Sequence, residues 1–170
     1  YIRTFVMYNY GGFYIDTDLE LIKPIPEEWL YNSTILPTET THIISNYFIG
    51  ASIKNRFFKK LLSIYQEDKG EESPLDIDKW VAPSCWETPF HSTYGEYNIR
   101  TAENGAFKST HGVKVLSIEE MCPYYPWDIE RSKDSVDTTN SIGIHYWNNY
   151  KKVNNIKLDS YNTKFFDEQS

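Results

Sequence analysis

The stretch YNYGGFYIDTDLEL, residues 8–21, places a pair of glycines in front of two aspartates that are separated by one residue. Apolar and polar side chains alternate over residues 13–22, and this alternation predicts a single β-strand that ends before Pro24. The apolar side of such a strand faces the core. Asp16 and Asp18 would therefore lie together on the opposite face, roughly 7 Å apart along the strand.

The residues before this strand have the spacing of a helix. Apolar side chains recur every three or four positions, which predicts a helix over residues 1–9. These apolar positions are Ile2, Phe5, Val6 and Tyr10. Gly11 follows at the point where a left-handed C-terminal cap is expected.

Helices and strands alternate along the rest of the chain. The segments STILPTE and HIISNYFIGAS have the composition of strands, and residues 53–69 are predicted to form an amphipathic helix. Asn46 would either cap the turn that follows HIIS or hydrogen-bond an acceptor. Residues 79–95 have no regular period, so we expect an ordered loop there. Strands are predicted again in VKVLSIEEM and SIGIHYWNNY, and this order is typical of an α/β fold.

The composition excludes several classes of protein. With 170 residues, 40% of them hydrophobic, the chain is long enough for one globular domain. Its formal charge of -7 argues against a nucleic-acid partner, because affinity for the phosphate backbone comes from Lys and Arg. Cys85 and Cys122 match no zinc pattern. No apolar run in the sequence approaches the roughly 20 residues of a membrane-spanning helix.

The two aspartates are unusual for the interior of a strand, where Asp is disfavoured. An isolated Asp-x-Asp triplet is more often ordinary solvated surface. Here, however, Glu20 follows on the same face, and like charges this close cost free energy unless a positive group neutralises them. Carboxylates suit Mg²⁺ or Mn²⁺, which keep positions for water and phosphate oxygens. The pattern therefore predicts a divalent-cation site that can bridge to a diphosphate.

The segment RTFVMYNYGGFYIDTDLELIKPI resembles the signature of glycosyltransferases with a DXD sugar-binding region, the family 32 group that includes initiating mannosyltransferases and capsular-polysaccharide transferases. NYFIGASIKNRFFKKLL, VKVLSIEEMCPYYP and IHYWNNY resemble later elements of that family, in the same order. The resemblance covers residues 1–150, which we interpret as an N-terminally incomplete catalytic domain. Residues 151–170 would be a polar tail.

The resemblance implies the C-terminal portion of a GT-A fold, with a mixed sheet flanked by helices in a single domain. It also implies a retaining, metal-dependent transfer of a sugar from a nucleotide-diphosphate sugar to a glycan or other hydroxyl acceptor. Asp18 would ligate Mn²⁺ or Mg²⁺ directly, Asp16 would contact the donor and reach the ion through water, and His145 would be a third ligand. Arg3 would act on the donor with the two aspartates as a catalytic residue. The other donor contacts implied by the resemblance are Gly11, Gly12, Tyr14 and Trp147.

Alternatives stay open for the chain and for two of these residues. The alternative to an active transferase is a non-catalytic remnant of one, or a carbohydrate-binding or interaction module with a divalent-cation site. Because the family's nucleotide-binding strands would precede residue 1, a missing N-terminal region or a partner would complete the donor site. His145 has the alternative of a polar residue in a buried strand, and Trp147 that of core packing. The compartment would be cytoplasmic for a bacterial or viral enzyme and the Golgi or ER lumen for a eukaryotic one.

Overall fold

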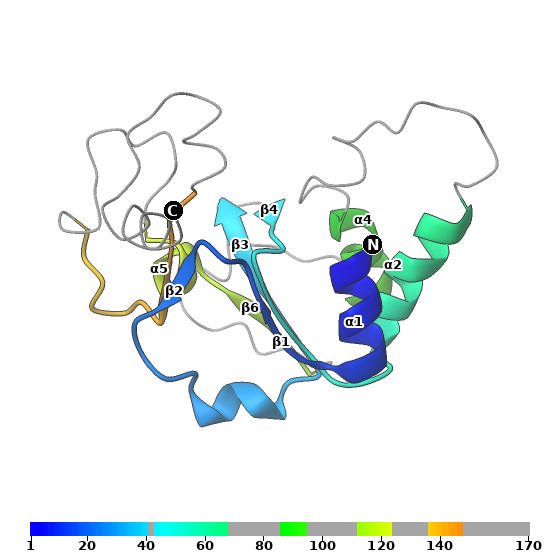
Figure 1. The fold of residues 1–170 in the computed structure, drawn as a ribbon, viewed down its shortest axis with the longest axis horizontal. Helices are drawn as coiled ribbons and strands as arrows, with labels where there is room; N and C mark the ends of the chain where they lie inside the picture. Colours follow the sequence, from blue (N-terminus) through cyan, green and yellow to red (C-terminus); the bar gives the residue numbers. More distant parts are fainter. Residues whose placement is uncertain (41–42, 68–85, 95–111, 124–135, 148–170) are drawn as a thin grey trace, which may run out of the picture. The chain divides into compact units, whose positions relative to one another are not determined.

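Five strands form a mixed sheet in the first of the two units into which the chain divides. The computed structural model (Figure 1) describes residues 1–40, 43–67, 86–94, 112–123 and 136–147. Unit 1 comprises Tyr1–Ile15 and Pro26–Ser117, and unit 2 comprises Asp16–Ile25 and Ile118–Ser170. Unit 2 is therefore built from two segments that are far apart in the sequence.

The strand order in unit 1 is β1-β5-β3-β4, and β6 pairs with β3. These strands are β1 (Gly12–Ile15), β3 (Thr34–Thr40), β4 (Ile43–Ile44), β5 (Phe48–Ala51) and β6 (Val113–Leu116). β6 runs parallel to β3, whereas the other pairs are antiparallel. The predicted α/β class, with a mixed sheet and flanking helices, is confirmed.

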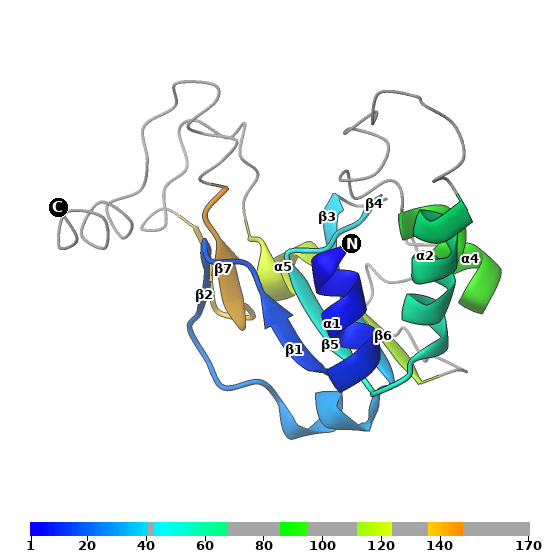
Figure 2. The same ribbon diagram turned by 45° about the vertical axis from the view of Figure 1, so that its right-hand side comes forward.

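Three helices of unit 1 lie next to this sheet (Figures 1 and 2). They are α1 (Ile2–Tyr10), α2 (Arg56–Glu67) and α4 (Glu87–Tyr94), and α2 packs against both others. The amphipathic pattern of α2 is confirmed, because Phe57, Phe58 and Leu61 are buried on one side of it. The core of the unit consists of Met7, Leu36, Ile44, Ile49, Phe57, Phe58, Leu61, Trp86, Phe90, Val113 and Val115.

α4 corrects the prediction of a loop over residues 79–95. The apolar residues among its eight residues, ETPFHSTY, show little helical periodicity, so the sequence pattern did not predict this helix. Pro89 is tolerated because it lies in the first turn, where a backbone N–H has no partner within the helix. Phe90 anchors the helix by packing its ring against that of Phe57, with ring centroids 6.0 Å apart.

α1 confirms the predicted helix but not the side of it that packs. Thr4 and Met7 are buried, whereas Ile2 and Tyr10 of the predicted apolar face are 78% and 75% exposed. The contacts of α1 with α2, β1 and β5 determine which side is covered. All four residues of the predicted apolar stripe are exposed, so helical spacing predicted the helix but not the side of it that packs.

The single strand predicted over residues 13–22 is wrong. β1 ends at Ile15, and a separate strand, β2 (Leu19–Leu21), belongs to unit 2. Between them the Leu19 N–H donates to the Asp16 carbonyl at 3.1 Å, which closes a turn over residues 16–19. The predicted alternation of faces is wrong as well. Leu19 and Leu21 should share the apolar face, but Leu19 is buried while Leu21 is 37% exposed.

In unit 2, β2 pairs antiparallel with β7 (Gly143–His145), and the short helix α5 (Ile118–Met121) contacts β7 (Figure 2). Backbone hydrogen bonds tie the segments together, since the carbonyl of Ile142 accepts from Ile22 at 2.9 Å and the N–H of Ile142 donates to Glu120 at 2.7 Å. The strands predicted in VKVLSIEEM and SIGIHYWNNY are thus confirmed in β6 and β7. The predicted tail over residues 151–170 lies outside the described residues.

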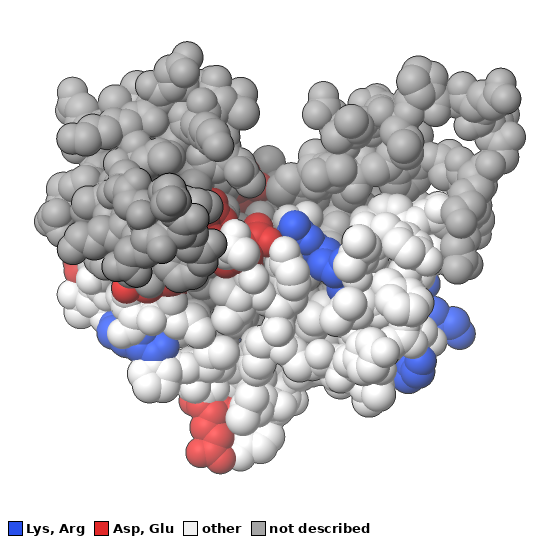
Figure 3. All heavy atoms as spheres, in the orientation of Figure 1, with Lys and Arg blue, Asp and Glu red and all other residues white. Residues whose placement is uncertain are grey.

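A 3-10 helix, η1 (Glu27–Tyr31), connects back to β3 in unit 1. Trp29 is its buried residue and packs against Phe48 of β5, with ring centroids 6.1 Å apart. Glu27 and Glu28 project to solvent and form the acidic patch over η1 in Figure 3. Among the helices that the structure describes, none has the length and apolarity that crossing a membrane requires.

Candidate functional site

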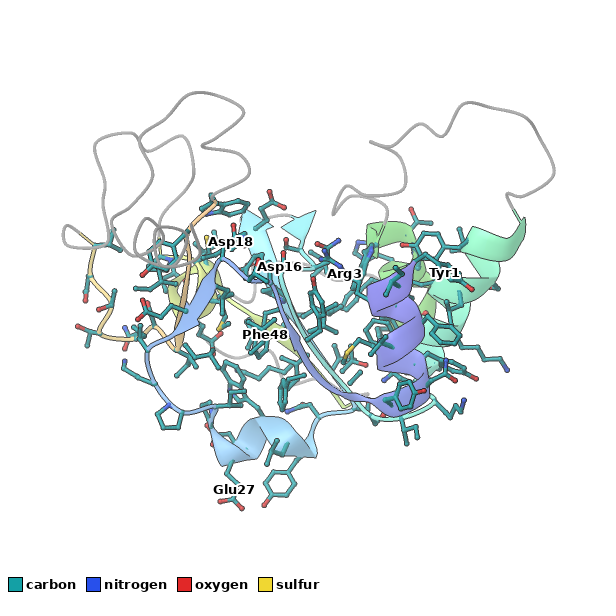
Figure 4. All side chains as sticks on the ribbon, viewed as in Figure 1. Tyr1, Arg3, Asp16, Asp18, Glu27 and Phe48 are labelled. Carbon is teal, nitrogen blue, oxygen red and sulfur yellow. The ribbon has the colours of Figure 1, made fainter. Side chains whose placement is uncertain are left out.

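The turn that follows β1 presents two carboxylates, those of Asp16 and Asp18 (Figure 4). Each offers an oxygen to a cluster that also includes a ring nitrogen of His145, and these ligand atoms all lie within 4.8 Å of one another. The three residues belong to unit 2. The structure therefore brings together the three side chains that were expected to hold a metal ion, although it does so with a turn instead of an extended strand.

Strand pairing places His145 beside the aspartates. Leu19 of β2 stands opposite His145 of β7, and the Tyr146 N–H donates to the Asp18 carbonyl at 2.8 Å. As a result His145 Nε2 lies 3.3 Å from Asp18 Oδ1. The imidazole is 7% exposed and the Asp18 side chain 15% exposed, so both groups are largely withdrawn from water.

This arrangement can hold a divalent cation. Two carboxylates close together repel each other, and a cation between them removes that cost. The donors are two carboxylates and one imidazole, and carboxylates suit Mg²⁺ and Mn²⁺ whereas imidazole favours transition metals. A hard transition-metal ion such as Mn²⁺ satisfies both preferences. An ion on three protein ligands also keeps coordination positions for water or phosphate oxygens.

Trp147 follows directly and lies against the histidine. Its ring centroid is 4.3 Å from that of His145, and its indole N–H donates to Cys122 Sγ at 3.2 Å. Trp147 is 8% exposed and Cys122 is fully buried. Sequence reasoning missed Cys122, because a lone cysteine far along the chain gives no spacing signal once zinc patterns are excluded.

Tyr146, the residue that follows β7, connects this strand to β2. Its hydroxyl donates to the Glu20 carboxylate at 2.5 Å. Glu20 was predicted to share the acidic face of the two aspartates, but in β2 it accepts this hydrogen bond instead and stands opposite Ile144. The cluster of metal-ligand atoms within the described residues consists of Asp16, Asp18 and His145 and does not include Glu20.

Arg3 and Tyr14 are two of the donor contacts expected in unit 1, and they touch each other. The Arg3 guanidinium lies 4.6 Å from the centroid of the Tyr14 ring, a cation–π contact. Arg3 Nη1 also donates to the Asn46 carbonyl at 2.7 Å and to Asn46 Oδ1 at 3.0 Å. Asn46 thus holds Arg3, a role that its position after HIIS did not indicate. Figure 4 shows Arg3 projecting from α1.

Gly11 and Gly12 make the sharp entry from α1 into β1. Their φ angles are +65° and +87°, values that glycine adopts without strain. Gly11 has ψ of -156°, so it is not the left-handed cap that the sequence predicted, although its N–H donates to Met7 O at 3.0 Å. A Cβ on Gly11 would meet the Ala51 carbonyl oxygen and the Ile53 nitrogen at 2.8 Å. Within unit 1 this glycine serves close backbone packing.

The turn lies in a segment that is similar to a known family region. Residues 1–39 match a family model described as glycosyltransferase sugar-binding region containing DXD motif. The aspartates of this range are Asp16 and Asp18 alone, so these two residues are its DXD.

One relative extends the similarity over most of the chain. It is the human alpha-1,4-N-acetylglucosaminyltransferase, to which the chain is 25% identical over 167 residues. That alignment covers 95% of this chain and 45% of the human protein, so the chain spans less than half the length of this relative. No solved structure matches the chain significantly. The two matches support a glycosyltransferase.

Proposed function

We propose that this chain is part of a metal-dependent, retaining glycosyltransferase. The reaction would move a sugar from a nucleotide-diphosphate sugar to a hydroxyl group of a glycan or another acceptor. The observation that carries the proposal is the convergence of Asp16, Asp18 and His145 within 4.8 Å, in a chain whose first 39 residues match a DXD sugar-binding region. The two findings share Asp16 and Asp18, and His145 is the independent observation because the family model ends at residue 39.

In this proposal Asp16, Asp18 and His145 hold Mn²⁺ or, less readily, Mg²⁺. The imidazole favours Mn²⁺, because Mg²⁺ prefers oxygen donors. When bound, such an ion stabilises the negative charge that develops on a leaving diphosphate. The chain's own residues would orient the ion and limit its access to water. Both tasks suit the low exposure of His145 and Asp18.

The proposed roles of the unit 1 residues rest on the family resemblance and on their chemistry. Arg3 would bind a phosphate or the sugar of the donor, because a guanidinium pairs strongly with phosphate oxygens. Tyr14 supplies a flat face under that guanidinium, and Asn46 holds it by two hydrogen bonds. Arg3 is thus oriented before a ligand arrives, which lowers the entropic cost of binding. Gly11, Gly12 and Trp147 stay proposed donor contacts.

Retention is proposed without a covalent intermediate. Retaining glycosidases use two carboxylates that flank the scissile bond, one as nucleophile and one as acid/base. Asp16 and Asp18 lie on one turn and would share one cation, so neither is assigned as nucleophile. The acceptor hydroxyl would instead attack the donor face that the leaving group vacates.

A second function is a cation-dependent binding module that performs no transfer. The cluster of Asp16, Asp18 and His145 supports this alternative as well, because three ligands can hold a cation without any transfer reaction. The two functions separate by experiment, since both predict cation-dependent binding of a nucleotide sugar but only the first predicts release of nucleotide diphosphate.

Calorimetric titration tests the proposal. The chain is titrated with Mn²⁺ and with Mg²⁺, and then with nucleotide sugars that carry mannose or N-acetylglucosamine. We expect Mn²⁺-dependent binding that Asp18→Ala abolishes. Asp137→Ala is the matched control, because Asp137 is an exposed aspartate of the same unit whose carboxylate accepts from Thr139 N–H. Binding that survives Asp18→Ala, or a folded chain that binds no cation, contradicts the proposal.

A further inference from the structure

The backbone at Trp147 adopts a conformation that large side chains rarely tolerate. Its φ angle is +57°, and among the described non-glycine residues only Lys54 shares a positive φ. Such a conformation costs free energy for a bulky residue and persists only where the surroundings over-determine it. Residues held in this way concentrate at functional sites, and Trp147 lies two positions after His145, one of the three candidate metal ligands.

The indole of Trp147 lies against the imidazole of His145. The ring centroids are 4.3 Å apart, so the two rings are in direct contact. The planes are tilted by 53°, a geometry in which one ring limits the rotation of the other.

A hydrogen bond fixes the other side of the indole. The Trp147 Nε1–H donates to Cys122 Sγ at 3.2 Å, and Cys122 is fully buried. The Cys122 N–H in turn donates to the Ile118 carbonyl at 2.6 Å, which ties the cysteine to α5. The indole is thus held between a thiol on one element and an imidazole on another.

We propose that Trp147, anchored at the Cys122 thiol, is a positioning residue that fixes the imidazole of His145 toward Asp18. The consequence for cation binding rests on the proposed function, whereas the orientation of the ring does not. Partners of this kind, which contact a metal ligand and not the metal, commonly change metal affinity by about 10- to 100-fold when they are removed. Trp147 and Cys122 therefore act through His145.

Two variants and one control test the inference by Mn²⁺ affinity. Trp147→Gly removes the indole and keeps a residue that tolerates the positive φ, and we expect its dissociation constant to rise about tenfold or more. Cys122→Ala removes only the anchor and should weaken binding several-fold. Ile144→Val shortens a neighbouring buried side chain of β7 and should lower the melting temperature without changing Mn²⁺ affinity. Wild-type affinity in both folded test variants overturns the inference.

A second measurement needs no cation. The ring protons of His145 should show the ring-current shift of an adjacent indole in the proton NMR spectrum, and His145→Gln identifies these signals among the four histidines. We expect the signals to move in Trp147→Gly and to move or broaden in Cys122→Ala. Unchanged His145 signals in both variants overturn the inference. If the wild-type chain binds no Mn²⁺, the proposed function fails and the NMR result alone decides whether Trp147 positions His145.

Discussion

At the scale of single residues, Asp18 combines a structural and a chemical role. Its carbonyl oxygen accepts the Tyr146 N–H, while its carboxylate faces His145. The backbone contact does not depend on the side chain. Substitution of the carboxylate should therefore remove the candidate metal site and leave the pairing of β2 with β7 in place.

Mn²⁺ should accordingly raise the melting temperature of the wild-type chain but not that of Asp18→Ala. A ligand present at 100 times its dissociation constant stabilises the folded state by about 2.7 kcal/mol, provided that it does not bind the unfolded chain. Differential scanning calorimetry with and without Mn²⁺ measures the effect, and Asp137→Ala should retain it. An equal rise in Asp18→Ala would show that the ion binds elsewhere.

Asn46 offers a test of how Arg3 is held. Asn46→Ala removes the Oδ1 acceptor but keeps the carbonyl acceptor. The lost hydrogen bond should remove about 1 kcal/mol of the free energy that holds the Arg3 guanidinium in place. We expect the affinity for a nucleotide diphosphate to fall about fivefold, as calorimetry can measure. Asn9→Ala, on the same helix as Arg3 and bonded to the Phe5 carbonyl, should leave that affinity unchanged. An unchanged affinity in Asn46→Ala would mean that Tyr14 and the backbone carbonyl of residue 46 suffice to orient the guanidinium.

The Tyr94 phenol should lower the free energy of unfolding at alkaline pH. Burial raises the pKa of the Tyr94 phenol, although its hydrogen bond to Thr34 and the nearby Arg56 act in the opposite direction. An unfolded tyrosine ionises near pH 10, whereas the folded chain keeps the Tyr94 proton to higher pH. The folded state then binds more protons, so its stability falls as the pH rises above about 10.

The comparison with Tyr94→Phe isolates this effect, because the other tyrosines titrate in both proteins. The free energy of unfolding of the wild type, relative to the variant, should decrease between about pH 9 and pH 11. Urea unfolding at these two values measures it. A constant difference would mean that the Tyr94 phenol ionises at the same pH in the folded and the unfolded chain.

At the scale of elements, the junction of α1 and β1 depends on two glycines with different surroundings. Both have positive φ, but a Cβ on Gly11 would lie 2.8 Å from backbone atoms of Ala51 and Ile53, whereas a Cβ on Gly12 would meet nothing within 4 Å. Backbone atoms cannot move aside as the end of a flexible side chain can. Gly11 therefore carries a steric requirement in addition to the conformational one.

Gly12→Ala should cost about 1–2 kcal/mol, the usual penalty of a left-handed conformation. Gly11→Ala should cost clearly more, because the clash adds to this penalty and forces β5 away from the junction. Chemical denaturation of the two variants measures the difference. Equal destabilisation would show that the chain between β5 and α2 can shift to accept a methyl group.

At the scale of the whole molecule, the chain divides into two units, each built from two separate segments of the sequence. Unit 2 takes Asp16–Ile25 from the middle of a segment that otherwise belongs to unit 1. The candidate metal ligands are all in unit 2, whereas Arg3, Tyr14 and Asn46 are in unit 1. A cation bound by Asp16, Asp18 and His145 is therefore expected to stabilise unit 2 directly.

Hydrogen exchange should reveal this division. Mn²⁺ is expected to slow the exchange of the amides that join β2, β7 and the turn, such as those of Leu19 and Tyr146, because binding opposes their local opening. Amides of the β3–β5 pairing in unit 1 should change less. Equal protection throughout would show that the two units open together.

Local pattern determined much of what the sequence could predict. The helices at residues 1–9 and 53–69 and the strands that became β3, β6 and β7 follow from periodicity and composition, because short-range sterics and apolar spacing act within each segment. Asp16 and Asp18 were predicted as a cation site from residue chemistry and spacing, and His145 was predicted from the family resemblance; the structure brings the three side chains together. Their recognition did not need the correct secondary structure around them.

Tertiary contacts decided the rest. The break after Ile15, the exposed stripe on α1 and the holding of Arg3 by Asn46 all depend on partners distant in the sequence. The same holds for Trp147, whose left-handed backbone, histidine neighbour and Cys122 anchor join residues from separate elements. Alternation along one strand cannot specify which sheet the next residues enter, because the free energy of that choice comes from burial against other segments.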